Sequence, residues 1–485
     1  MKLNDDVLYE AFKARDARFD GRIFVGVSST GIYCRPVCKA KHAKRENCTF
    51  FPSAAAAEKA GYRPCLLCRP ELAPGYSITD ASSALAKKAV RLIEESCGTG
   101  ESLRKIAEKL GCTPRHLRRV FMEEYKVTPI QYMQTCRLLL AKNLLTDTDL
   151  SVLDVAMAAG FGSLRRLNDL FHEQYHLTPT ALRRNAAKGK APQGEITVNI
   201  GYRPPYRWNE ILEFFAQRAI SGVEKVAAGA YMRTVHLTDR NGKIHRGWIR
   251  VSDDQKKNAL SVTLSDTLVP VLSQVLTRVK RLFDMYCEPD VVYETVRTLN
   301  DVKPGAYVPG LRIPGCFDSL ETAVRAILGQ QITVKAANVL AARIAAAFGK
   351  PLETGIEGLQ LTFPSIKDFI SLEDPEEELG RLGVIAARSR CITELAKKLY
   401  TGDIELDDCV DPETEIQKLM RIKGIGKWTA NYIAMRTMGW PDAFLETDSG
   451  IRHALPDLKP EEMAAMSEKW KPWRSYVTMG LWNSL

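Results

Sequence analysis

The stretch MRIKGIGKWTANYIAMRTMGWPDAFLETD, from Met420 to Asp448, decides how the C-terminal half of this chain folds. A short apolar run is followed by Gly424-Ile425-Gly426, where glycine permits positive φ angles and lets the backbone approach a ligand closely. Apolar residues then recur at helical spacing from Lys427 to about Met438. This pattern predicts two helices joined by a glycine hairpin, which can offer backbone N–H groups and the Lys427 cation to a phosphate. An ordinary turn between helices is the alternative.

Asp448 lies 22 residues after Gly426 and directly before a predicted helix from Ser449 to Leu455. By position alone, its carboxylate could simply be the N-cap of that helix. Together, however, KGIGKWTANYIA and AFLETDSGIRHAL resemble the helix-hairpin-helix DNA glycosylases, in particular the AlkA-type 3-methyladenine DNA glycosylases. The resemblance continues through GYRPPYRWNEILEFFAQRAISGVEKV, RLFDMYCEP, PGLRIPGCFDSLETAVRAILGQQIT and WKPWRSY, and it covers most of residues 196–485.

The resemblance implies that Asp448 is the catalytic residue, with Glu446 as the fallback. Breaking an N-glycosidic bond leaves an oxocarbenium-like sugar, and a nearby carboxylate stabilises the developing positive charge. A glycosylase also holds its extruded base against aromatic surface, and the resemblance assigns this pocket to Trp428, Tyr432 and Trp482. Flat aromatic walls favour a positively charged alkylated purine. Each of these rings, taken singly, is more typical of a core position.

Two positions depart from the glycosylases that this stretch resembles. Enzymes that also cut the strand carry a lysine nucleophile where this chain has Trp428, so we expect a monofunctional glycosylase that leaves an abasic site. Gln331 stands where AlkA has a leucine wedge for the vacated base stack, and glutamine can fill the same space. Gly424, Gly426 and Lys427 are the expected contacts to the DNA backbone. Because no four-cysteine cluster follows the hairpin, no iron–sulfur cluster is expected.

The composition is typical of a globular protein with several domains. At 485 residues the chain should form three or four domains, and its 45% hydrophobic content can build ordinary cores. Its apolar runs are far shorter than a membrane span, and residues 1–10 lack the apolar core of a signal peptide. We therefore expect a cytoplasmic protein without a membrane partner, whose 12 cysteines are metal ligands or buried thiols rather than disulfides.

Positive charge is concentrated in the N-terminal part of the chain. Residues 1–190 hold 31 Lys and Arg against 20 Asp and Glu, a net charge of +11. The remaining residues hold 37 against 38, a net charge of −1. An excess of this kind is typical of a nucleic-acid-binding region, although diffuse charge alone is weak evidence.

Two pairs of cysteines lie in the first 75 residues, Cys34 with Cys38 and Cys65 with Cys68. Pairs with this spacing fit a tetrahedral Zn²⁺ site. The turn-rich segment between them is too small for a large core, so bound zinc would supply much of the folding energy. Four unconnected buried thiols are the alternative, and Cys48 fits neither pair.

The sequence around these cysteines, TGIYCRPVCKAKHAKRENCTFFPSAAAAEKAGYRPCLLCRP, resembles the N-terminal domain of Ada, the methyl-responsive regulator of alkylation repair. The resemblance implies that Cys34 accepts a methyl group from a DNA methylphosphotriester. A zinc-bound sulfur is a nucleophilic thiolate at neutral pH. Methylation removes one negative charge from a four-thiolate centre that repels DNA, which should strengthen phosphate binding. A purely structural zinc knuckle is the alternative.

The part of the chain after the zinc motif is predicted to be helical, and it repeats itself. IAEKLGCTPRHLRRVFMEEYKVTP (106–129) is echoed by VAMAAGFGSLRRLNDLFHEQYHLTP (155–179), so that Phe121 recurs as Phe171. An alanine, a glycine turn and a basic second helix indicate a helix-turn-helix unit. Two such units joined by a helix from Ile130 to Leu145 resemble the AraC-type DNA-binding domain. The expected DNA contacts are Arg115, His116, Arg118 and Arg119 in the first unit and Ser163, Arg165 and Arg166 in the second.

A short segment with Gly, Pro and Lys at residues 186–194 is typical of a linker. After it, residues 196–264 alternate between apolar and polar in short runs that favour antiparallel strands. The AlkA resemblance implies a small α+β lobe there, with a covering helix at residues 269–287. We therefore expect a multidomain protein that is mainly α with α+β parts. The predicted domains are an Ada-like zinc domain (1–76), an AraC-type double helix-turn-helix domain (78–188), an AlkA-like antiparallel α+β lobe (195–300) and an all-α helix-hairpin-helix glycosylase domain (301–485).

These features predict a DNA repair enzyme fused to its own sensor and regulator. The expected activities are release of 3-methyladenine and related bases, and transcriptional activation in response to methylphosphotriesters. The expected partners are alkylated and promoter double-stranded DNA and RNA polymerase, and the expected cofactor is one Zn²⁺. One alternative is a transcription factor whose C-terminal half only binds DNA; another is a repair enzyme whose N-terminal half is only a tether. Because no Pro-Cys-His-Arg motif follows, repair of O6-methylguanine is not expected.

Overall fold

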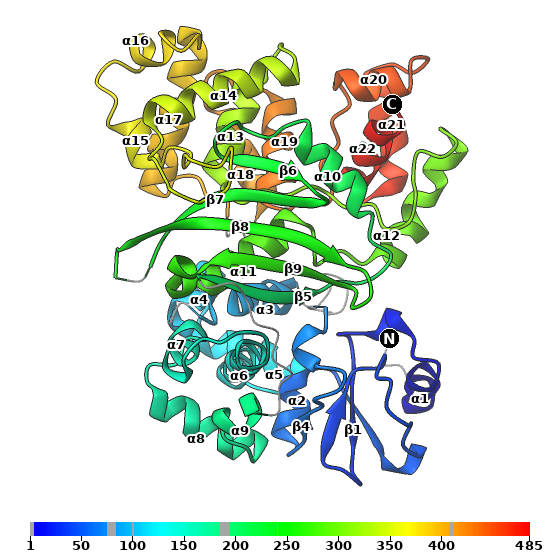
Figure 1. The fold of residues 1–485 in the computed structure, drawn as a ribbon. Helices are drawn as coiled ribbons and strands as arrows, with labels where there is room; N and C mark the ends of the chain where they lie inside the picture. Colours follow the sequence, from blue (N-terminus) through cyan, green and yellow to red (C-terminus); the bar gives the residue numbers. More distant parts are fainter. Residues whose placement is uncertain (1–3, 75–83, 99–100, 185–193, 240, 408–410) are drawn as a thin grey trace. The chain divides into compact units, whose positions relative to one another are not determined.

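Figure 1 shows the structure, a computed structural model that describes the chain except for residues 1–3, 75–83, 99–100, 185–193, 240 and 408–410. The chain forms two compact units. The first consists of Met1–Pro204, Leu237–Arg246 and Val251–Thr277, and the second of Pro205–His236, Gly247–Arg250 and Arg278–Leu485. The architecture is mainly helical with two small sheets, which confirms the predicted fold class. The predicted linker lies, apart from Gly194, outside the described residues.

The N-terminal part is built around a small sheet with the strand order β3-β1-β2-β4. The strands are β1 (Phe24–Val27), β2 (Ile32–Cys34), β3 (Cys48–Phe51) and β4 (Arg63–Pro64). The helices are α1 (Asp5–Lys13), α2 (Ala54–Lys59) and the 3-10 helices η1 (Ala17–Phe19), η2 (Arg45–Asn47) and η3 (Pro70–Leu72). One of its apolar clusters contains only Phe24, Tyr33 and two alanines as buried members. Cores of this size agree with a fold that depends on a bound metal.

Two helix-turn-helix units follow, α4-α5 and α7-α8, and the long helix α6 joins them. The helices of this part are α3 (Ala84–Ser96), α4 (Leu103–Lys109), α5 (Pro114–Tyr125), α6 (Pro129–Asp147), α7 (Val152–Ala158), α8 (Leu164–Tyr175) and α9 (Pro179–Arg184). The hydroxyl oxygens of Thr113 and Ser163 cap the second helix of each unit. Phe121 and Phe171, which the repeat aligns, are both fully buried. The sequence repeat is therefore a repeat of core positions.

A five-stranded sheet has the order β5-β9-β8-β7-β6. Its strands are β5 (Glu195–Gly201), β6 (Glu224–Ala227), β7 (Ala230–Thr238), β8 (Ile244–Asp254) and β9 (Ala259–Ser265). The predicted run of strands is interrupted by helix α10 (Trp208–Ala216), whose apolar residues recur at helical spacing. The predicted covering helix is shorter than expected, since 3-10 helix η4 (Asp266–Val271) precedes α11 (Leu272–Leu282). Pro270 explains this, because proline disfavours the α conformation in the residue before it.

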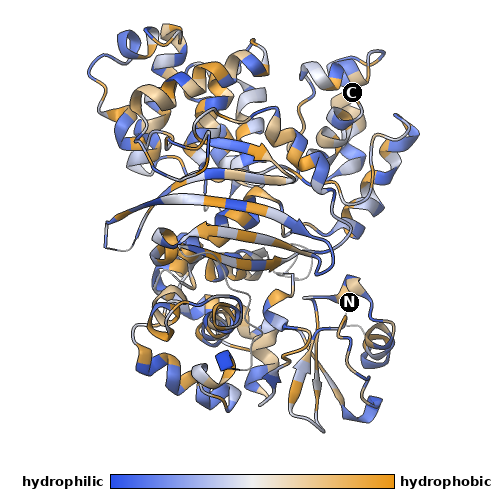
Figure 2. Ribbon diagram, in the orientation of Figure 1, coloured by the Kyte–Doolittle hydropathy of each residue, from blue (hydrophilic) through white to orange (hydrophobic). Residues whose placement is uncertain are grey.

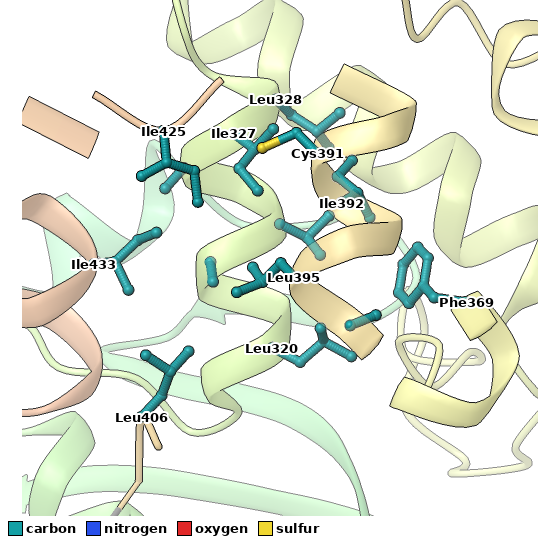
Figure 3. Packing of buried hydrophobic residues seen from close by; sticks show 14 of the residues in the cluster. Leu320, Ile327, Leu328, Phe369, Cys391, Ile392, Leu395, Leu406, Ile425 and Ile433 are labelled. Carbon is teal, nitrogen blue, oxygen red and sulfur yellow. The ribbon is translucent and has the colours of Figure 1, made fainter. Parts of the chain in front are cut away.

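The rest of the chain is helical, as expected for the glycosylase core. Its helices are α12 (Pro289–Val296), η5 (Arg297–Asp301), α13 (Ser319–Leu328), α14 (Val334–Phe348), α15 (Ile366–Ile370), α16 (Pro375–Gly380), α17 (Ala386–Thr401), α18 (Pro412–Met420), α19 (Lys427–Thr437), α20 (Ser449–Ala454), α21 (Pro460–Ser467), η6 (Glu468–Trp470) and α22 (Arg474–Asn483). Figure 3 shows their main core, in which Ile327 of α13 lies near Cys391 of α17 and Ile425 of the hairpin. The hairpin is thus anchored to this apolar cluster by its central isoleucine.

Apolar and hydrophilic residues are interspersed along the helices and strands in Figure 2. None of the helices in the described part of the chain has both the length and the apolar character needed to cross a membrane. Helices such as α5 and α8 have one face suited to a core and another suited to water.

Candidate functional site

The predicted glycine hairpin is present between α18 and α19, with Gly426 as the N-cap residue of α19. Gly424 has a φ of +102°, in the left-handed region that glycine adopts without strain. The side-chain amide of Gln330 donates to the Gly424 carbonyl oxygen at 2.8 Å and so ties the neighbouring turn to the hairpin. Gly424, Gly426 and Lys427 are exposed. The first N–H groups of α19 therefore face outward, as contact with a phosphate requires.

Asp448 is both a helix cap and the centre of a polar cluster. Its Oδ1 accepts the backbone N–H groups of Gly450 at 2.8 Å and Ile451 at 3.2 Å, at the start of α20. The same oxygen accepts the indole N–H of Trp482 at 2.8 Å, and Oδ2 accepts the indole N–H of Trp428 at 3.1 Å. The two interpretations of the sequence are therefore compatible. A carboxylate fixed by four donors is already oriented for electrostatic stabilisation of a nearby cation.

The three predicted pocket aromatics lie together beside this carboxylate. Trp428 stacks on Tyr432 with ring centroids 5.2 Å apart and planes 8° apart, and Tyr432 lies 6.3 Å from Trp482. All three are partly exposed, as residues that receive a base must be. A fourth ring, Phe214 of α10, stacks on Trp482 at 6.5 Å. Phe214 was not predicted as a pocket residue because the alternating pattern favours strands there; the helical spacing within WNEILEFFA was the available signal.

Arginine side chains also contact this aromatic cluster. The guanidinium carbon of Arg218 lies 3.8 Å from the Phe214 ring centroid, and that of Arg436 lies 4.8 Å from the same ring. Arg436 also donates to the Tyr432 hydroxyl at 2.5 Å. Burial by itself would raise the pKa of Tyr432, but the positive charges of Arg436, Arg218 and Arg325 outweigh it and lower that pKa. No local pattern predicts these arginines, because only the tertiary fold brings α10 against α19.

The other predicted glycosylase residues lie on the exposed side of the hairpin. The Lys427 ammonium contacts the Glu446 carboxylate, so the fallback carboxylate is directed toward the hairpin. Gln331 lies in the turn between α13 and α14, exposed and with a φ of +55°. A non-glycine residue in the left-handed region is costly, and such conformations cluster at ligand-binding sites. The backbone thus presents Gln331 in a manner suited to a wedge.

The four predicted zinc ligands come together in the N-terminal part. One sulfur from each of Cys34, Cys38, Cys65 and Cys68 lies within 4.8 Å of the others. Zn–S bonds of about 2.3 Å place the corners of a tetrahedron about 3.8 Å apart, so a small contraction of this cluster fits the ion. The cluster therefore holds one Zn²⁺. Cys48 lies in β3 and is not part of it, as predicted.

Contacts among the thiols perturb their acidity. Hydrogen bonding to Cys38 and to the other two thiols raises the pKa of Cys34, whereas the hydrogen bond with Cys34 lowers the pKa of Cys38 to about 7. These shared protons are the ones that a bound Zn²⁺ displaces. Cys68 differs from the other ligands in being partly exposed, and its Sγ accepts the backbone N–H of Arg35 at 3.4 Å.

The predicted DNA-contacting residues of the two helix-turn-helix units lie at the N-terminal ends of α5 and α8. Every one of them is exposed, as a recognition helix in the major groove requires. The residues are Arg115, His116, Arg118, Arg119, Ser163, Arg165 and Arg166. Arg119 pairs with Glu123 at 3.0 Å on the same helix face, and Ser163 is also the N-cap of α8. An exposed ion pair of this kind is weak, so Arg119 can exchange Glu123 for a DNA phosphate.

Known protein families match four successive segments of the chain. Residues 7–71 match the metal binding domain of Ada, and residues 106–185 match a helix-turn-helix domain. Residues 197–318 match the AlkA N-terminal domain, and residues 324–474 match the HhH-GPD superfamily of base excision DNA repair proteins. The four matches follow the order of the predicted domains.

Three relatives show how these segments combine. A protein of Mycobacterium tuberculosis described as a "probable bifunctional transcriptional activator/DNA repair enzyme AlkA" is 35% identical over 98% of this chain and 96% of its own length. DNA-3-methyladenine glycosylase 2 of Escherichia coli is 36% identical over 58% of this chain and 95% of its own. The bifunctional transcriptional activator/DNA repair enzyme Ada of Escherichia coli is 38% identical over 28% of this chain and 37% of its own.

The similarity to the mycobacterial protein extends over nearly the full length of both chains, and the cysteine cluster, the helix-turn-helix units and the hairpin with Asp448 all lie within it. These findings confirm the predicted fusion of a DNA-binding regulator with a base excision glycosylase that acts on double-stranded DNA. The chain belongs to the AlkA-type family of bifunctional transcriptional activators and DNA repair enzymes.

Proposed function

We propose that the C-terminal half releases 3-methyladenine and related alkylated bases from duplex DNA, with Asp448 as the catalytic carboxylate. The observation that supports this most is the double hydrogen bonding of Asp448 by Trp428 and Trp482, which joins the carboxylate to the aromatic pocket. A flipped base between these rings would place its glycosidic bond beside Oδ2. Asp448 would then stabilise the oxocarbenium-like sugar while water completes the hydrolysis.

The DNA backbone is proposed to bind at the hairpin. Gly424 and Gly426 leave the first N–H groups of α19 open, and Lys427 adds a cation that Glu446 holds in place. Gln331 is proposed to enter the space that the flipped base leaves. Because Trp428 occupies the position of the lysine nucleophile, the product is an abasic site and not a cut strand.

Incubation of the full-length protein with methylated duplex DNA tests this activity. Free alkylated base and abasic sites should appear together, while borohydride should trap no covalent protein–DNA adduct. Release of base from unmethylated DNA at the same rate, or a trapped imine, would refute the proposal.

A second function is proposed for the cysteine cluster, in which Cys34 accepts a methyl group from a DNA methylphosphotriester. Backbone N–H groups donate to Cys38, Cys65 and Cys68, which stabilises those thiolates and makes them weaker nucleophiles. The strongest contacts of Cys34 are with the other three thiols. Bound Zn²⁺ keeps the sulfur deprotonated. The Cys34 sulfur then forms the S–CH₃ bond as the methyl O–C bond breaks, and the phosphodiester oxygen leaves with the electron pair.

The N-terminal half is further proposed to activate transcription in the cytoplasm. Residues at the N-terminal ends of α5 and α8 would contact promoter bases, and RNA polymerase would be the protein partner. The proposed domain limits are 1–76, 78–188, 195–300 and 301–485.

Peptide mass analysis after incubation with a methylphosphotriester duplex tests the methyl transfer: the added methyl group should lie on Cys34. A methyl group on the more exposed Cys68 would refute this assignment.

A further inference from the structure

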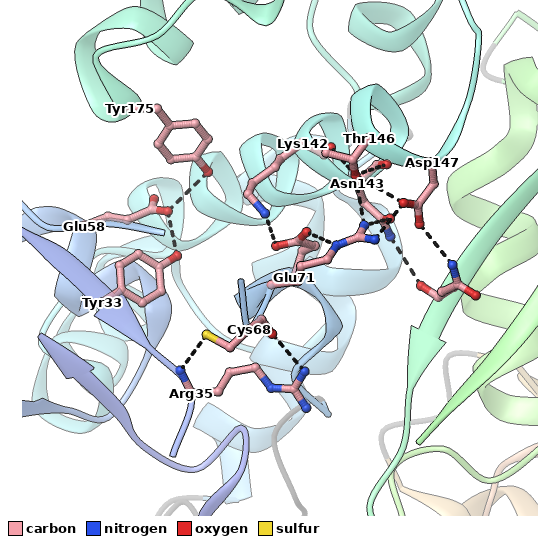
Figure 4. A network of polar contacts seen from close by, with 12 residues as sticks. Tyr33, Arg35, Glu58, Cys68, Glu71, Lys142, Asn143, Thr146, Asp147 and Tyr175 are labelled. Carbon is pink, nitrogen blue, oxygen red and sulfur yellow. Dashed lines mark hydrogen bonds and ion pairs between the residues drawn. The ribbon is translucent and has the colours of Figure 1, made fainter. Parts of the chain in front are cut away.

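The zinc domain and the helix-turn-helix domain meet at a buried polar contact, which we call the interdomain seam. Figure 4 shows part of it, including Glu58 and Glu71. Its first group of side chains is Tyr33, Glu58, Thr135 and Tyr175. Its second group is Arg69, Glu71, Lys142 and Asp147. Both groups lie within the first compact unit.

The first group converges on the carboxylate of Glu58, in α2. This carboxylate accepts the Tyr33 hydroxyl at 3.0 Å from its own domain. From the helix-turn-helix domain it accepts the hydroxyls of Thr135 in α6 at 2.7 Å and Tyr175, the last residue of α8, at 3.3 Å. Glu58 is buried, and burial raises its pKa to about 7 although the hydroxyl donors oppose the shift. One carboxylate thus connects three elements, one of which is the recognition helix of the second unit.

The second group is a chain of ion pairs. The side chains of Glu71 and Lys142 are each 2% exposed, and the ammonium nitrogen lies 2.5 Å from the carboxylate oxygen. Arg69 binds Glu71 at 2.9 Å and reaches Asp147, at the end of α6, at 2.7 Å. Each domain therefore supplies charges whose partners belong to the other domain.

Each group begins next to a zinc ligand. Tyr33 directly precedes Cys34 in β2, and Arg69 directly follows Cys68. Successive side chains of a strand point to opposite faces. Tyr33 accordingly points toward the seam while Cys34 points into the cysteine cluster. Cys34 is thus linked to α6 and α8 through Tyr33 and Glu58, and Cys68 is linked to the end of α6 through Arg69.

A polar seam of this kind fixes one arrangement of the two domains. Two apolar faces can slide past one another at little cost, whereas a displaced seam would leave Lys142 buried without its carboxylate partner. It would also deprive Glu58 and Glu71 of the partners that the helix-turn-helix domain supplies. Because that penalty is large, the domains should keep a single relative orientation.

We propose that the interdomain seam holds the zinc domain and both helix-turn-helix units as one rigid DNA-reading body, with Glu58 as its positioning residue. This inference rests on the proposed methyl transfer to Cys34. Two DNA-binding parts in fixed register bind together without the entropy cost of ordering them on the duplex. The zinc centre then lies beside one defined phosphate. The loss of negative charge on methylation of Cys34 therefore strengthens binding at that phosphate. If the seam loosens, the same charge change occurs but adds less to the affinity.

A full-length variant with Thr135→Val and Tyr175→Phe tests this. It removes two hydroxyl donors to Glu58 from the helix-turn-helix side and leaves the zinc domain sequence unchanged. Glu58→Gln is the matched control, since its amide oxygen still accepts hydrogen bonds at nearly the same volume. Each protein is methylated with a methylphosphotriester duplex. It is then titrated at fixed salt with a duplex that the methylated wild-type chain selects from a random pool.

Methylation should raise the affinity of the wild type and of Glu58→Gln roughly tenfold or more. In the double variant the gain should fall to about twofold or less, with zinc content and methyl uptake unchanged. An undiminished gain in the double variant overturns the proposal. If the double variant loses zinc, Lys142→Met is tested in its place, because this substitution alters only the second group of the seam. An undiminished gain in affinity on methylation of Lys142→Met would also overturn the proposal.

Hydrogen exchange separates this inference from the proposed methyl transfer. If wild-type Cys34 takes up no methyl group, the methyl-acceptor function fails. Even then, the proposed seam predicts that the backbone amides of α2 and α6 exchange faster in the double variant than in Glu58→Gln. Equal exchange in the two variants refutes the seam whether or not Cys34 is methylated.

Discussion

Replacing Asp448 by asparagine separates its catalytic role from its role as a helix cap. An asparagine oxygen in the place of Oδ1 keeps the acceptor for the N–H groups of Gly450, Ile451 and Trp482. The amide nitrogen takes the place of Oδ2 and cannot accept the indole N–H of Trp428. The substitution therefore preserves most of the local structure while it removes the negative charge.

The substitution has two energetic effects, a small one on stability and a larger one on the rate of base release. The lost hydrogen bond to Trp428 costs about 1 kcal/mol of stability, which a domain of this size tolerates. A unit charge about 4 Å from the developing sugar cation contributes about 4 kcal/mol at an effective dielectric constant near 20. Loss of that term slows base release roughly a thousandfold. Binding of abasic DNA depends on the hairpin and should change little.

Single-turnover release of 3-methyladenine from methylated duplex DNA measures the rate, and titration with abasic duplex measures binding. Glu446→Gln is the comparison, because it neutralises the fallback carboxylate that pairs with Lys427. Its release rate should stay within about fivefold of wild type, since a partly exposed ion pair contributes about 1 kcal/mol at most. Asp448→Asn with near-wild-type release, or a larger loss in Glu446→Gln, would refute the assignment of Asp448.

Three further predictions concern other parts of the chain. Cys65→Ser should lose zinc and expose the N-terminal 75 or so residues to rapid hydrogen exchange, and a zinc content equal to wild type would contradict the four-cysteine site. Burial raises the pKa of Glu58 from 4.5 to about 7, so its protonated form stabilises the fold below pH 4.5 and this contribution is lost as the pH rises toward 7. Relative to Glu58→Gln, the wild type should therefore lose up to about 3 kcal/mol of stability between pH 4.5 and 8, measured by denaturant unfolding of the full chain at each pH; a pH-independent difference would contradict the buried carboxylate. Gly424→Ala, at a φ of +102°, should cost about 1–3 kcal/mol and weaken binding of abasic DNA severalfold, and unchanged binding would show that the hairpin amides do not contact the phosphate.

Local sequence patterns were sufficient to predict the modules and their main ligands. Cysteine spacing predicted the zinc cluster, and the fifty-residue repeat around Phe121 and Phe171 predicted two helix-turn-helix units; the structure places all of these residues as expected. Such features are local, because a pair of ligands in one turn, a helix face or a glycine hairpin involves residues close together in the chain. The helix α10 was missed for a related reason: a short helix among strands leaves only a weak periodic signal.

Long-range packing determines which distant side chains act together. Phe214 and Arg218 reach the pocket of Trp428 because α10 packs beside α19, and no local pattern encodes that contact. Glu58 would be an ordinary surface residue of a short helix on sequence grounds, yet the fold buries it beneath hydroxyls from α6 and α8. The physical reason is that burial and charge pairing depend on non-local packing, and a buried charge is stable only where partners from elsewhere in the chain meet it.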